Sequence, residues 1–230
     1  NYNEVQYTKY ILNIKKGILY QNHPAFYKEN DNYYYHALSN EDLTNINTLK
    51  DFKKESTREL IADDYIYQIK RLSDNSNHSP IAGVMQEYIL GFNEYKKKLS
   101  DLENQNSKDK IDFMRVNQIS GIKKIDNYTF SIILKKQYPQ FVYWLAMPFF
   151  SPMPWEADLF YNQKILKNKN ITLNWYPIGT GPFKLTENNP NLRMVLKKNE
   201  NFRGEVYPSL KDKIENKKLI SINKEKVIPF

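Results

Sequence analysis

The spacing of apolar residues changes several times along this chain, and these changes constrain the fold more than any other feature. Alternate residues face the same side at 8–14 and at 128–134, which is the period of a half-buried β-strand. At 62–72 and 81–92 apolar residues recur every three to four positions, as on one face of a helix. The strand and helix segments do not alternate regularly as βαβ units do. The sequence therefore predicts an α+β or mixed α/β fold.

Turn signals between these segments predict three β-hairpins. Residues 7–21 are interpreted as one hairpin that turns at 15–17. Asp126-Asn127 is a two-residue hairpin signal between strands at 119–125 and 128–134. The segments 183–187 and 193–197 form the third predicted hairpin.

The helix predicted at 62–72 carries Asp63 and Asp64 in its first turn, as the helix dipole favours. A second helix is predicted to begin at Ser79-Pro80 and to continue to about residue 102, followed by a polar loop at 104–110. Shorter helices are predicted at 139–146 and 155–161. Residues 22–57 have no clean period and are interpreted as a long irregular excursion.

Charge and composition exclude little. The net charge is +8, but lysines are spread along the whole chain, which favours solvated surfaces over a binding stripe. The longest apolar run, at about 142–150, is broken by Pro148 and is far shorter than the ~20 residues of a membrane helix. Aromatic residues make up 14% of the chain. They leave open a nucleic-acid- or carbohydrate-binding module, in which aromatic rings would stack on bases or sugars.

Residues suited to catalysis or metal binding are scarce. The chain has no cysteine, its three histidines are dispersed, and it lacks the common nucleophile and phosphate-loop motifs. We therefore expect no enzymatic activity, no metal site and no cofactor. Gly179-Thr180-Gly181 begins like a dinucleotide fingerprint, but Pro182 follows at once and the third glycine is missing. We interpret these three residues as a structural corner before a strand, with glycines at positive φ.

Several segments together resemble bacterial extracellular solute-binding proteins of family 5, the peptide/nickel class. Residues 61–71 are similar to that family's T-A-x-D-x-x-Y-x-x-x-R signature, and residues 14–18 to its I-R-x-G-V. The sharpest similarity is at 177–185, where PIGTGPFKL stands against P-x-G-T-G-P-Y-x-L. Residues 198–204 follow with a match to R-N-P-x-Y-x-G.

The resemblance implies a periplasmic-binding-protein-like fold with an extra subdomain inserted early in lobe one. Residues 1–172 would be that subdomain, and 173–230 would be the part of lobe one that leads to the hinge, with a strand at 227–230. The second lobe would be absent. The resemblance implies a component of an ABC importer that binds a small peptide or peptide-like solute and delivers it to a membrane permease. It implies neither an enzyme nor a nucleic-acid-binding protein. It further implies a periplasmic or membrane-anchored extracytoplasmic location, in a Gram-negative bacterium.

Two segments are candidates for the wall of the solute cleft in such a protein. They are the helix start at 79–87 and the connection at 147–155. The residues that we expect to contact ligand are Ile81, Val84, Met85, Met147, Phe149 and Phe150. Gly179, Thr180 and Gly181 are expected at the hinge corner.

Overall fold

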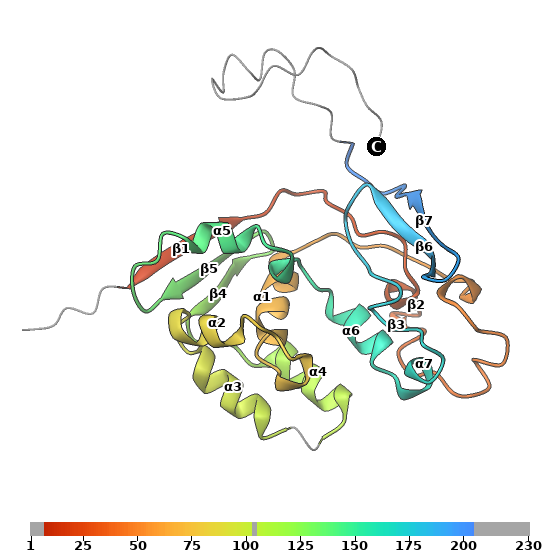
Figure 1. Ribbon diagram of the computed structural model, residues 1–230, viewed down its shortest axis with the longest axis horizontal. Coiled ribbons are helices and arrows are strands. Elements are labelled where there is room, and N and C mark those ends of the chain that lie inside the picture. Colours follow the sequence, from red (N-terminus) through yellow and green to blue (C-terminus); the bar gives the residue numbers. More distant parts are fainter. Residues whose placement is uncertain (1–6, 103–104, 205–230) are drawn as a thin grey trace, which may run out of the picture.

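The computed structural model describes residues 7–102 and 105–204, and two parts of the molecule lie side by side in Figure 1. The part on the left, here called the sheet body, comprises residues 8–14 and 62–150. The part on the right, the aromatic body, comprises residues 20–57 and 155–178. The hairpin β6–β7 follows the aromatic body in the chain. The class is mixed α/β, as the sequence predicts.

The sheet body contains a three-stranded antiparallel sheet in the order β1-β5-β4. Strand β5 (Thr129–Leu134) is central, and β4 (Ile122–Asp126) joins it through the predicted turn. Strand β1 (Thr8–Asn13) pairs with the other side of β5, with Thr8 opposite Leu134. The β4–β5 hairpin is therefore confirmed.

The predicted hairpin over residues 7–21 is wrong, although its first strand exists. The Ile14 amide donates to the Tyr128 carbonyl at 2.7 Å and extends the β1–β5 ladder. Residues after Gly17 pair instead with the segment at 58–60, through Leu60 N–H to Ile18 O at 2.8 Å and Tyr20 N–H to Arg58 O at 3.1 Å. This distant pairing buries Tyr20 and Leu60 together in a small cluster, which a local hairpin would not provide.

Helix α1 (Ala62–Arg71) packs against the sheet and confirms the predicted helix within a residue. The long helix predicted from Ser79 is two helices, α2 (Ala82–Tyr88) and α3 (Phe92–Ser100). They separate at Gly91, whose φ is +75°. There Leu90 leaves the helix, donates to the Ile133 carbonyl and accepts from Gly121 N–H, both at 3.0 Å, so that the break attaches the helices to the sheet.

Two further helices complete the sheet body. Helix α4 (Ser107–Val116) occupies part of the predicted loop at 104–110, so that prediction is wrong. The Asn106 side chain caps its first turn, and Ile111 and Met114 bury one face, a sparse apolar pattern within a polar window. Helix α5 (Phe141–Leu145) and a 3-10 turn at Pro148–Phe150 follow β5.

The aromatic body has little regular structure, as expected for residues 22–57. It holds a 3-10 turn at Pro24–Phe26, the short strands β2 (Lys28–Glu29) and β3 (Asn32–Tyr33), and a 3-10 turn at Leu49–Asp51. Helix α6 (Trp155–Tyr161), predicted at these residues, and helix α7 (Lys164–Lys167) pack beside them. One buried hydrophobic cluster is continuous from this body into the sheet body.

The hairpin of β6 (Phe183–Asn189) and β7 (Arg193–Lys198) confirms the third predicted hairpin. It exposes Phe183, Met194 and Leu196. The predicted strand at 227–230 lies outside the described residues. In the part of the chain that the structure describes, no helix has the length and apolar character needed to cross a membrane.

The prediction that Gly179 and Gly181 have positive φ angles is wrong. Among the described glycines only Gly17, Gly91 and Gly204 have positive φ. An added Cβ would meet nothing within 4 Å at Gly181, and only a backbone nitrogen 4.0 Å away at Gly179. The corner is held instead through carbonyls, since Gln21 N–H donates to Gly179 O and the Asn199 amide donates to Gly181 O, both at 2.9 Å. That these two glycines and Thr180 form the hinge corner remains a prediction.

Candidate functional site

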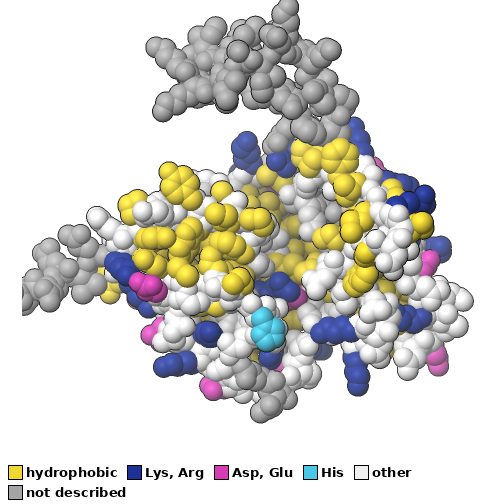
Figure 2. Space-filling view, viewed as in Figure 1, with side chains coloured by type: hydrophobic (Ala, Val, Ile, Leu, Met, Phe, Trp, Pro, Cys, Tyr) yellow, Lys and Arg dark blue, Asp and Glu magenta, His cyan; other side chains and the backbone are white. Residues whose placement is uncertain are grey.

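An apolar pocket of about 290 Å³ opens at one end of the sheet body, where β1, α1 and the residues after β5 meet. Apolar side chains also gather on the surface of the sheet body that faces the viewer in Figure 2. Tyr65 of α1 stacks on Phe130 of β5 in the pocket, with ring centroids 5.9 Å apart. The lining residues are Leu12, Asn13, Ile14, Lys15, Ile18, Tyr65, Ile69, Phe130, Leu145 and Phe150. Such a pocket suits an apolar side chain of a ligand.

The predicted wall residues fall into different environments. Phe150 lines the apolar pocket, and the other five predicted residues do not. Met85 is fully buried in the core, and Ile81 and Phe149 pack half-buried against that core. Met147 is 46% exposed, and Val84 is half-buried. The structure brings Phe149 and Phe150 together, with ring centroids 5.1 Å apart, and a ligand-binding role for the six residues remains a prediction.

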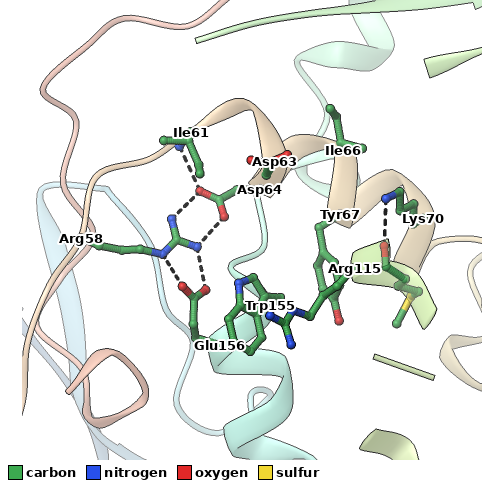
Figure 3. Close-up of a pocket in the computed structure, with 11 residues that line it drawn as sticks. Arg58, Ile61, Asp63, Asp64, Ile66, Tyr67, Lys70, Arg115, Trp155 and Glu156 are labelled. Carbon is green, nitrogen blue, oxygen red and sulfur yellow. Dashed lines mark hydrogen bonds and ion pairs between the residues drawn. The ribbon is translucent and has the colours of Figure 1, made fainter. Parts of the chain in front are cut away.

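A second, polar pocket of about 320 Å³ lies between α1, α4 and α6 (Figure 3). Its floor is an ion cluster in which Arg58 lies between Asp64 of α1 and Glu156 of α6. The Arg58 Nε and Nη2 atoms donate to the two oxygens of Glu156, each at 2.7 Å. Nη1 and Nη2 donate to the two oxygens of Asp64 at 2.9 and 2.6 Å. One guanidinium therefore binds two carboxylates, each bidentately.

The electrostatics of this cluster follow from one cation serving two buried anions. Burial lowers the pKa of Arg58, but hydrogen bonds and charge from Asp64 and Glu156 outweigh it and hold that pKa well above its usual range. Burial raises the pKa of Asp64, although Arg58 opposes this. The cluster carries a net charge of −1 with both carboxylates ionised, so loss of Arg58 would leave two buried anions without a counter-ion.

Lys70 lies in the same pocket and is also buried. Its Nζ donates to the Met114 carbonyl at 2.8 Å, and burial lowers its pKa to about 8. Arg115 crosses the pocket rim and lies over the Trp155 ring at 3.6 Å, a cation–π contact. The pocket thus mixes charges of both signs, and its cations have protein partners.

A second polar contact joins α1 to α6 one to two turns further along α1. Tyr67 Oη donates to Asp158 Oδ2 at 2.7 Å, and Arg71 Nε donates to Asp158 Oδ1 at 3.0 Å. Asp158 is only 4% exposed. Both ends of α1 are therefore tied to α6 by ion pairs.

Sequence reasoning missed this cluster. Asp64 was explained by the helix dipole alone, and its carboxylate does accept from Ile61 N–H at 3.0 Å. The available signal was Glu156, which precedes Ala157 and shares a helical face with Phe160, both fully buried. A carboxylate on an apolar helix face indicates a buried partner. Among the described residues no group of three or more histidine or acidic side chains could hold a metal ion.

Comparison with known proteins decides the family. The sequence model described as "Bacterial extracellular solute-binding proteins, family 5 Middle" matches residues 25–219. The chain belongs to this family. It is 28% identical over 145 residues to the periplasmic oligopeptide-binding protein OppA of Salmonella typhimurium, a match that covers 61% of this chain and 22% of the relative. It is 31% identical over 157 residues to the dipeptide-binding protein of Escherichia coli, covering 67% and 24%.

Solved structures of periplasmic binding proteins are similar to this chain at lower sequence identity. The periplasmic binding protein DppA of Helicobacter pylori, solved in complex with the peptide STSA, superposes with a TM-score of 0.48 at 18% identity. That superposition covers 86% of this chain and 28% of DppA. The oligopeptide-binding protein OppAIV of Borrelia burgdorferi gives 0.46 at 24% identity, covering 63% and 25%. The chain thus spans about a quarter of the length of the relatives it matches.

Proposed function

We propose that this chain is part of the solute-binding component of an ABC importer, and that the whole protein binds small peptides and delivers them to a membrane permease. The observation that carries the proposal is the family match over residues 25–219. The relatives named above are oligopeptide- and dipeptide-binding proteins, which supports peptide as the solute class. Their location supports a periplasmic or membrane-anchored extracytoplasmic protein.

The place of this chain within the whole protein is part of the proposal. Residues 1–172 are the early subdomain of lobe one, and 173–230 return to lobe one and lead to the hinge. The second lobe lies outside this sequence, which fits a chain that matches less than a quarter of OppA. Solute would then favour the closed arrangement of two lobes, and the closed form would be recognised by the permease.

The apolar pocket is the proposed contribution of this chain to the cleft. Its wall includes Phe150, which lies within the predicted segment 147–155. The pocket is open on one side, whereas good small-molecule sites bury ~70–90% of their ligand. A second wall is needed to bury a peptide, and the missing lobe would supply it.

The test compares the 230-residue chain with the complete gene product by calorimetry, using a mixed library of tri- to pentapeptides. We expect micromolar or tighter binding by the complete protein and weak or no binding by this chain. Equal affinity of the two proteins would show that the whole site lies within these residues. Failure of the complete protein to bind any peptide, with retention of an oligonucleotide or a glycan, would overturn the proposal in favour of another binding module.

A further inference from the structure

The contact between the sheet body and the aromatic body contains an unusually complete arginine cluster. Arg58 has five N–H donors, and all five are used. Four bonds go to Asp64 and Glu156, and the fifth goes from Nη1 to the Glu59 carbonyl at 2.9 Å. No N–H donor of Arg58 remains for a ligand. The cluster is therefore an intramolecular contact between the two bodies and not an empty binding site.

Two aromatic rings also lie close to the guanidinium, making cation–π contacts with it. The Tyr20 and Phe26 ring centroids lie 5.4 and 5.3 Å from its central carbon. Tyr33 Oη donates to Glu156 Oε1 at 3.1 Å and brings strand β3 into the same cluster. The position of Arg58 is therefore held by hydrogen bonds and ring contacts to residues from both bodies.

This geometry constrains an angle and not only a distance. A planar guanidinium with two bidentate carboxylates holds both in defined directions relative to its own plane. Asp64 is in the first turn of α1 and Glu156 in the first turn of α6, as Figure 3 shows. The hydrophobic attraction in the apolar core beneath is non-directional. The directional contacts of this interface are the polar cluster, which binds two carboxylates at once, and the smaller contact of Tyr67 and Arg71 with Asp158.

We propose that Arg58 is a positioning residue that sets the angle between the sheet body and the aromatic body. The functional part of this inference rests on the proposed function. The angle places the apolar pocket of the sheet body relative to the remainder of lobe one, which follows the aromatic body in the chain. Arg58 acts through Asp64 and Glu156 and does not touch the solute. Loss of the bidentate geometry loosens the angle and weakens peptide binding even when both bodies stay folded.

The chain has no cysteine, so two labels can be placed without background. Lys123→Cys on β4 and Lys164→Cys on α7 are exposed positions, one on each body. Nitroxide labels at both sites report the distance between the bodies by double electron–electron resonance. We expect one narrow distance distribution in the parent protein. In Arg58→Lys, which keeps the positive charge but lacks the planar guanidinium, the distribution should be broader or shifted.

The matched control is Asp63→Asn. Asp63 is the neighbour of Asp64 on α1, but its ion pair with Lys124 at 2.5 Å stays inside the sheet body. This variant should keep the narrow distribution. The triple variant Arg58→Met, Asp64→Asn, Glu156→Gln removes the buried charges together, which avoids leaving an unpaired ion. It should fold by circular dichroism and still lose the narrow distribution.

An unchanged distribution in folded Arg58→Lys or in the folded triple variant would overturn the proposal. Peptide affinity of the complete protein is measured separately for the same variants. A narrow parent distribution that Arg58→Lys broadens, in a protein that binds no peptide, would retain the positioning role and reject the proposed function. Broadening together with weaker peptide binding supports both.

Discussion

The sheet body and the aromatic body are stabilised in different ways. In the sheet body, backbone ladders between β1, β5 and β4 carry aliphatic side chains such as Ile132 and Leu134, both fully buried, into a regular core. The aromatic body has two strands of two residues each and relies on side chains that bind backbone carbonyls. Lys169 Nζ, for example, donates to Leu43 O at 2.8 Å and to Ile46 O at 2.6 Å.

A buried histidine shows how far the aromatic body depends on such bonds. His23 Nδ1 accepts from Ala25 N–H at 3.0 Å, and Nε2 lies 2.7 Å from Tyr161 Oη. Tyr161 donates its own proton to the Tyr176 carbonyl at 2.6 Å, so Nε2 carries the hydrogen in the bond to Tyr161. This chain of bonds needs neutral His23. Periodic apolar packing thus builds one body, and satisfied polar groups specify the other.

The largest expected effect tests the core of the sheet body. Phe130→Ala removes a ring that is 2% exposed and should lower the free energy of unfolding by about 3–5 kcal/mol. Met194→Ala on the exposed hairpin is the control and should change it by less than about 0.5 kcal/mol. Urea denaturation measures both. If both variants lowered the free energy of unfolding by similar small amounts, the stability of the sheet body would not depend on its apolar core.

Acid should act on the aromatic body first. Burial, with a smaller contribution from His36, lowers the pKa of His23 from 6.5 to about 3, so the unfolded chain takes up a proton that the folded chain does not. Stability is therefore complete above about pH 6.5 and falls as pH decreases, by about 2 kcal/mol at pH 5 from this residue. Burial also lowers the pKa of His36 to about 4, which adds in the same direction.

Hydrogen exchange at pH 7 and pH 5 measures this difference locally. Protection should be lost earlier in residues 20–57 than in β4 and β5, since the sheet body contains only His78 among the three histidines. His23→Gln removes one of the two titrating groups, so the loss of stability between these pH values should become smaller. Uniform loss of protection in both bodies would contradict the comparison.

Removing one carbonyl tether should have a smaller effect. Lys169→Met keeps most of the aliphatic stem but removes the Lys169 donor from the Ile46 carbonyl and one of two donors from the Leu43 carbonyl, at a cost of about 1–3 kcal/mol. The exchange of amides at 43–52 should accelerate while β5 stays protected. Lys164→Met, at an exposed position of α7, is the matched control. If it accelerated exchange at 43–52 equally, the effect of Lys169→Met would come from the lost charge and not from the lost hydrogen bonds.

The smallest effect concerns the corner at Gly181. Its φ is not positive and a Cβ meets nothing within 4 Å, so Gly181→Ala should be neutral or stabilise by up to about 1 kcal/mol. Gly91→Ala is the contrasting variant, because φ is +75° and the new Cβ would lie 2.0 Å from Ser120 Oγ. Thermal unfolding separates them. A clear loss at Gly181 would show that this corner needs glycine for another reason.

The features that the sequence predicted are those with local signals. Asp126-Asn127 specifies the turn of the β4–β5 hairpin within a few residues, and the apolar spacing at 62–72 specifies α1. The failed hairpin at 7–21 depends on a choice between partners far apart in the chain. Arg58 and Asp64 are close in the chain but Glu156 comes from a distant segment, and each residue alone has an ordinary surface explanation. Their meaning depends on burial, which spacing does not reveal.

The pairing of β1 with β5 also bears on how this protein acquires its structure over time. Thr8 meets Leu134, so the sheet cannot close until more than half of the 230 residues have been made. Contacts between such distant segments slow folding, because the loop must lose its entropy before the ladder forms. The β1–β5 pairing therefore stays open until Leu134 has been made, and β1 is unpaired until then.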